Sequence, residues 1–147
     1  MTLIGDALIG FRAVLIGLIP NTTIFYEDDD IDLTGKAKYI KIKESHSTES
    51  AGVGGDKKWN LNFILDCYFK SGSDKNINYK AQAEDWFFSI VEAIEKRTTF
   101  DLFLQNSSIK FGDIYSNDAY PFEAEKPGKF KRIISLKGYI INTTTYP

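Results

Sequence analysis

The sequence predicts an α+β fold, with a mostly antiparallel sheet of about five strands and two helices packed on one face. The expected order of elements is α-β-β-β-α-β-β. Residues 58–70, KWNLNFILDCYFK, alternate apolar and polar side chains with the period of a strand that buries one face. Residues 3–19 and 79–97 repeat their apolar side chains with the period of a helix. No repeat or linker divides the 147 residues, so we expect a single domain over 1–147.

The first element is an apolar helix that ends at Pro20. The stripe expected to face the core consists of Leu3, Ile4, Ala7, Leu8, Phe11, Val14, Leu15 and Leu18. Ile9, Ala13 and Ile16 lie on the opposite side, although a helix in a small domain usually has a polar outer side. The segment has no basic amino-terminal region and is too interrupted to span a bilayer, so we expect neither a signal peptide nor a membrane segment.

Three strands are expected after this helix. Residues 22–30 predict a short strand that runs into an acidic turn, and residues 36–45 predict a second strand. Residues 46–56 are polar and contain glycines, which indicates a flexible hairpin connection to the third strand at 58–70. The apolar face of that strand, from Trp59 to Phe69, is expected to pack against the second helix.

The second helix has the clearest periodicity in the chain. Its expected buried side consists of Tyr79, Ala83, Trp86, Phe87, Ile90, Val91 and Ile94, whereas Phe88 falls on the outer side among acidic residues. Residues 100–105 are compatible with a short strand or a helical turn. Residues 108–116 and 129–142 then predict the last two strands.

The charge balance argues against nucleic acid as the main partner. The net charge is −2, whereas binding to phosphates needs a clustered positive surface. The best local candidate is the group of lysines at 36, 38, 41 and 43 beside Tyr39, which also fits the solvated edge of a strand. A nucleic-acid adaptor that uses these residues would show an affinity that falls steeply with salt.

No motif indicates catalysis or metal binding. The acidic run from Asp28 fails as a calcium loop, because Leu33 occupies the required glycine position and Tyr39 the required glutamate position. His46 is the only histidine and Cys67 the only cysteine, which is too few for a zinc site of the usual type. Cys67 is expected to be a buried, inert thiol. We therefore expect no enzyme, no cofactor and no metal.

Apolar residues that point away from the expected core indicate the function more clearly than the charges or motifs do. They lie on both helices and on the second face of the third strand, and they form the candidate subunit interface: Ile9, Ala13, Ile16, Phe88, Ile64 and Tyr68. Ile133, Tyr139 and Ile141 add a similar face on the last strand. A ring built from head-to-tail contacts needs two different complementary patches on each subunit. Cover of the first helix by residues 100–107 is the alternative within one chain.

This pattern resembles the tail terminator (tail completion) proteins of long-tailed bacteriophages. The likeness covers nearly the whole chain and rests on the apolar first helix, the third strand beginning KKWNLNFIL, the helix YKAQAEDWFFSIVEAIEK and the closing strand RIISLKGYIIN. The order of elements and the length agree with it. Neck and connector proteins of the same particles share this outline and stay as alternatives.

The resemblance implies a structural virion protein without catalysis. Such proteins form a ring, expected to be a homohexamer, that stops polymerisation of the tail tube and offers a docking surface to the DNA-filled head. The implied partners are the tail tube protein, the head–tail connector and DNA that passes transiently through the ring, with no membrane. The implied location is the tail or neck of the virion, assembled in the cytoplasm of the host bacterium. The segments 27–32 and 46–56 would be docking loops.

A different class of function also stays open. A small-molecule-binding α+β domain would be a monomer or dimer with a concave pocket that holds a few convergent polar groups.

Overall fold

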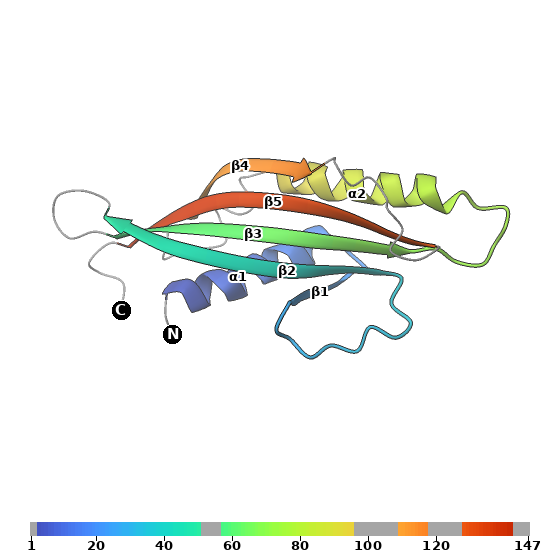
Figure 1. Cartoon of the computed structure of the whole chain (residues 1–147), viewed down its shortest axis with the longest axis horizontal. Helices are drawn as coiled ribbons and strands as arrows, with labels where there is room; N and C mark the ends of the chain where they lie inside the picture. Colours follow the sequence, from blue (N-terminus) through green and yellow to red (C-terminus); the bar gives the residue numbers. More distant parts are fainter. Residues whose placement is uncertain (1–2, 51–56, 96–108, 118–127, 143–147) are drawn as a thin grey trace.

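The computed structural model describes residues 3–50, 57–95, 109–117 and 128–142. The helices are α1 (Leu3–Leu18) and α2 (Tyr79–Glu95). The strands are β1 (Thr23–Tyr26), β2 (Lys38–Ser50), β3 (Lys57–Lys70), β4 (Ile109–Asn117) and β5 (Lys129–Asn142). The α+β class and the order α-β-β-β-α-β-β are confirmed for the described residues (Figure 1).

The strands form one sheet in the order β1-β2-β3-β5-β4. β3 lies at its centre and pairs antiparallel with both β2 and β5, while β4 pairs antiparallel with β5. β1 instead runs parallel to β2, so the sheet is mixed. A parallel pair cannot be joined by a tight hairpin. The long connection 27–37 therefore returns to the start of β2 outside the sheet (Figure 1).

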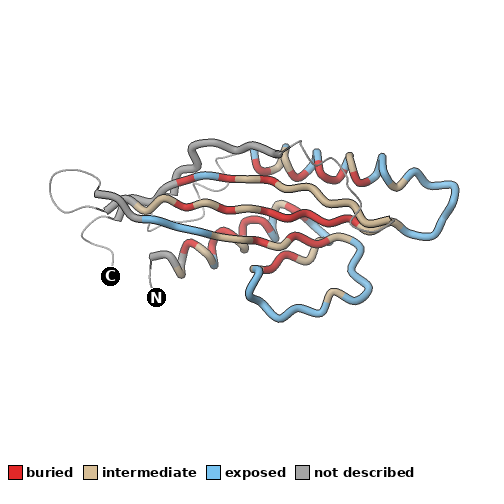
Figure 2. Tube along the Cα trace, in the orientation of Figure 1, coloured by how far each residue is buried: buried red, intermediate tan, exposed pale blue. Residues whose placement is uncertain are grey.

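Both helices pack on the same face of the sheet, which we call the helix face. Its core contains the inward side chains of β3 together with residues of α1 and α2. The rings of Phe11 and Phe63 stack with centroids 3.8 Å apart and join α1 to the central strand. Figure 2 shows the resulting alternation of buried and less buried positions along the strands. The opposite face, which we call the open face, carries neither of the described helices.

Local sequence explains where the helices begin and end. Asn78 precedes α2, and its side-chain oxygen accepts a hydrogen bond from the Ala81 amide at 3.1 Å, which satisfies a donor of the first turn. Pro20 follows α1, and Asn21 adopts a positive φ of 56°, a conformation that asparagine tolerates at the end of a helix.

The largest difference from the expected strand boundaries is at the end of β2, and the other boundaries of β2, β3, β4 and β5 differ by at most two residues. β2 continues to Ser50, so the predicted loop 46–56 is wrong over residues 46–50. The polar side chains there are compatible with a strand because β3 supplies backbone partners, from His46 opposite Leu61 to Ser50 opposite Lys57. The expected element at 100–105, and the cover of α1 by 100–107, lie outside the described residues.

Cys67 lies in the core of the helix face, as expected, and gives a direct test of the register of β3. Its side chain is fully buried, and burial raises the pKa of its thiol. Because the thiolate is the reactive form, we expect no alkylation by iodoacetamide under native conditions and complete alkylation in denaturant, measured by intact mass. Rapid native labelling would contradict this placement of β3.

Candidate subunit interface

The outer side of α1 exposes large apolar side chains. Ile9 is 58% exposed and Ile16 is 50% exposed, and Ala13 between them is also exposed. The opposite side of the same helix is buried at Ala7, Phe11 and Leu15 in the core of the helix face. Among the described residues nothing covers this outer side, so the three predicted residues form one accessible apolar surface.

A hollow of about 560 Å³ runs along this surface. It is lined by Gly5, Leu8, Ile9, Arg12, Ala13, Ile16, Tyr26 and Asp29. Most of these residues are apolar. Arg12 and Asp29 are the charged residues among them, and together with Tyr26 we refer to them as the border of the hollow. We call this feature the α1 hollow.

Hydrogen bonds between α1 and the β1 segment fix the border of the α1 hollow. Arg12 donates from Nε to the carbonyl of Ile24 at 3.0 Å, and the Tyr26 hydroxyl donates to the carbonyl of Leu8. Asp29 accepts from the Tyr26 amide at 3.0 Å. Burial, with a smaller effect of Glu44, raises the pKa of Tyr26, so its phenol stays neutral and keeps donating. The hollow is thus preformed.

Phe88 provides a second exposed apolar site, on the other helix. It is 62% exposed, while Phe87 beside it is fully buried. Asp85 and Glu92, at helical spacings of three and four residues, are exposed on the same side of α2. α1 contacts β1, at one edge of the sheet, whereas α2 contacts β5 and β4, towards the other edge (Figure 1). The two apolar sites therefore lie on different sides of the molecule.

The remaining predicted interface residues lie on the open face of the sheet. Tyr68 is buried in a small cluster with Phe25 and Tyr39, against which Leu33 packs, and its ring stacks on Tyr39 at 4.7 Å. Contrary to expectation, Tyr68 is therefore not exposed for a subunit contact. Ile64 is half-buried on the same face. The structure brings Ile9, Ala13 and Ile16 together but separates them from Phe88, Ile64 and Tyr68.

The sequence pattern did not predict the polar border of the α1 hollow or the burial of one charged side chain. Arg12, Tyr26 and Asp29 come from segments whose proximity no local pattern reveals. Asp66 is 1% exposed, and its Oδ2 lies 3.2 Å from Lys43 Nζ and 3.9 Å from Lys41 Nζ. Lys131 Nζ lies 4.0 Å away. The sequence signal for this cluster was Asp66 itself, an acidic residue in the middle of a long strand. A carboxylate that is buried in such a position needs compensating cations.

Two acidic residues of the predicted acidic turn, Asp29 and Asp32, accept hydrogen bonds from nearby backbone amides. Asp32 accepts a hydrogen bond from the Thr34 amide at 2.9 Å, and this bond lowers the pKa of the Asp32 carboxyl. Asp29 caps the end of β1 in a similar way. In the described part of the chain, no group of three or more histidine, cysteine or acidic side chains is placed to hold a metal ion. Neither described helix combines the length and hydropathy needed to cross a membrane.

His46 has local partners on β2 and β3. Its Nδ1 lies 2.9 Å from Glu44 Oε1, and its ring lies 5.7 Å from that of Trp59. These contacts hold the imidazole against neighbouring strand residues. It also borders a second hollow, at the end of the sheet, which is described below.

Comparison with known proteins adds no assignment, because no family model and no curated protein matches this sequence.

Proposed function

We propose that this chain is the subunit of a homo-oligomeric ring that terminates the tail tube of a long-tailed bacteriophage. The ring would be a hexamer in the neck of the virion, between the tail tube protein and the head–tail connector. The observation that supports a ring is the presence of two different exposed apolar sites on one subunit, the α1 hollow and Phe88. The role in a phage tail rests on the resemblance in the order of elements.

One of these two sites is an exposed side chain and the other is a hollow. Phe88 projects a large aromatic side chain from α2, and the α1 hollow offers an apolar recess beside β1. When a protruding group fits a recess elsewhere on an identical molecule, the contact is heterologous and generates a ring or a filament. A twofold dimer needs one self-complementary patch instead. Insertion of Phe88 of one copy into the α1 hollow of the next would cover both sites.

Charge supports the same pairing. Asp85 and Glu92 flank Phe88, and Arg12 stands at the border of the α1 hollow. Opposite charges around a buried apolar contact fix orientation and disfavour wrong partners. Asp29 lies at the same border, so the pairing requires Asp85 and Glu92 to lie beside Arg12 and away from Asp29. The contact would thus have an apolar centre with a charged rim, as is usual for protein interfaces.

The first experiment is to measure the native mass of the purified chain over a concentration series, with negative-stain images of the large species. We expect a closed six-fold ring in equilibrium with smaller species. A concentration-independent monomer that also fails to form rings on preformed tail tubes would contradict the proposal.

A capping assay separates a tail terminator from another neck ring. Purified chain is added to growing tail tubes, and tube length is measured by electron microscopy. We expect tubes of arrested length with added density at one end. Rings that leave tube growth unchanged would instead assign the chain to a different ring of the neck.

A further inference from the structure

The open face of the sheet carries a concentration of lysines. By the alternation of the strands, six lysines from β2, β3 and β5 share this face: Lys41, Lys43, Lys70, Lys129, Lys131 and Lys137. Their neighbours in sequence, such as Ile40, Ile42 and Leu136, are buried in the core of the helix face. We call this surface the lysine face.

Within the described side chains of β2, β3 and β5, lysines outnumber acidic residues on the lysine face. Asp66 is the one acidic side chain that β2, β3 and β5 contribute to it within residues 39–47, 60–70 and 129–137. Asp113 of the edge strand β4 pairs in register with Lys137. The side chains of Lys41, Lys43 and Lys131 remain 29%, 39% and 25% exposed while they surround the buried Asp66 carboxylate. The chain as a whole has a net charge of −2, so this cationic surface is strongly segregated.

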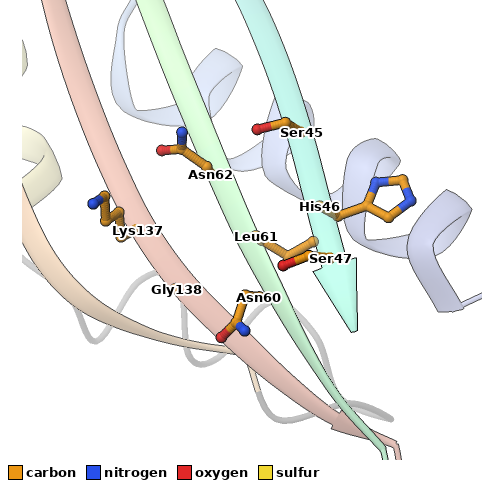
Figure 3. A pocket seen from close by; sticks show the side chains of 8 residues that line it. All are labelled: Ser45, His46, Ser47, Asn60, Leu61, Asn62, Lys137 and Gly138. Atoms are coloured by element: carbon orange, nitrogen blue, oxygen red, sulfur yellow. The ribbon is translucent and has the colours of Figure 1, made fainter. Parts of the chain in front are cut away.

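A polar hollow of about 410 Å³ continues the lysine face at the end of the sheet where β2 stops (Figure 3). Its lining consists of Ser45, His46, Ser47, Asn60, Leu61, Asn62, Lys137 and Gly138. The side-chain oxygen of Asn62 is buried there without a hydrogen-bond partner. Hydroxyl, amide and ammonium groups from adjacent strands are the groups that proteins use to contact phosphate oxygens.

The aromatic side chains that the structure describes on the open face limit what it can recognise. Tyr39 and Tyr68 are 5% and 6% exposed, and the ammonium groups of Lys129 and Lys131 lie over the Tyr68 ring at 4.8 and 5.4 Å. The rings of Tyr39 and Tyr68 are therefore not accessible for stacking with nucleic-acid bases. Proteins that bind single strands rely on exposed aromatic platforms, whereas contacts to the backbone need only cations and polar donors.

We propose that the lysine face binds the phosphodiester backbone of double-stranded DNA without reading its sequence. The lysines supply the charge, and the serine and asparagine side chains of the adjoining hollow add donors to phosphate oxygens. This inference does not rest on the proposed ring. The ring contact uses the α1 hollow, whereas DNA binding uses the lysine face, and the two surfaces lie on opposite faces of the sheet. In the ring, it would give the passing DNA a weak and reversible contact.

The test is the affinity of the full chain for a labelled DNA duplex between about 50 and about 200 mM salt. The variant K70Q/K137Q removes two charges from opposite ends of the lysine face and leaves the three lysines around Asp66 in place. We expect its slope of log K against log salt to be shallower by about 1.8 than that of the wild type, at about 0.9 per phosphate contact. Native mass is recorded for each sample.

The matched control is K75Q/K80Q, which changes the same net charge at exposed positions outside the sheet. We expect its slope to equal that of the wild type, and we expect duplexes of unrelated sequence to bind equally. Equal losses in both variants would overturn the proposal, as would tighter binding of single strands. Equal affinity for poly-L-glutamate would also overturn it, by indicating an acidic protein partner. Absence of duplex binding below about 100 µM at low salt would do the same.

Discussion

Replacing Ile9 and Ile16 with glutamate is expected to leave the fold intact and abolish the ring. Both side chains are at least half exposed, so their loss removes little from the core of the monomer. In the assembly they line the recess proposed for Phe88, where two carboxylates would be desolvated and would repel Asp29 and the acidic residues that flank Phe88. Native mass and negative-stain images measure the result, and circular dichroism checks the fold.

The matched control for this variant is I31E/I77E. It also converts two exposed isoleucines into glutamates, but it does so outside both helices. We expect it to assemble like the wild type. Rings formed by I9E/I16E at wild-type concentrations would show that the α1 hollow is not the interface. Loss of rings in both variants would attribute the effect to net charge.

Replacing Phe63 with alanine is expected to lower the free energy of unfolding by about 3–5 kcal/mol. Phe63 is fully buried on the central strand and stacks on Phe11, so the truncation leaves a cavity between β3 and α1. Urea denaturation measures the change, in the I9E/I16E background so that assembly does not contribute to apparent stability. The expected drop in melting temperature is on the order of 10 °C.

Phe88→Ala is the paired control, since it removes the same side chain from a position that is 62% exposed. In the same background we expect its unfolding free energy to stay within about 0.5 kcal/mol of the parent. In the otherwise unchanged chain we expect it to weaken the ring. Similar destabilisation by the two substitutions would contradict the assignment of the faces of α2 and β3.

Much of the fold could be predicted because it depends on local periodicity. The period of β3 predicts which of its side chains meet the helices, since successive residues of a strand point to opposite faces. The stripe of α2 predicts its buried side for the same kind of reason, and Ala83, Trp86, Phe87, Ile90 and Ile94 are buried as expected. The exposed isoleucines of α1, Ile9 and Ile16, were predictable because they lie outside the apolar stripe of that helix.

Other features depend on which segments meet, and no local pattern encodes that. The parallel pairing of β1 with β2 is one such feature, and it requires the long connection 27–37. His46 to Ser50 form a strand because β3 offers them backbone partners, although their polarity indicates a loop. Tyr68 is buried because Phe25, Tyr39 and Leu33 converge on it from elsewhere in the chain.

By itself, then, the sequence determined the class of fold, the order of its elements and the apolar surface of α1. Only the tertiary structure decided that this surface is a recess bordered by Arg12, Tyr26 and Asp29, and that lysines from two strands, β2 and β5, gather around Asp66. The physical reason is that periodicity specifies the direction of a side chain within its own element. The neighbours of that side chain depend on strand order and register, which long-range packing sets.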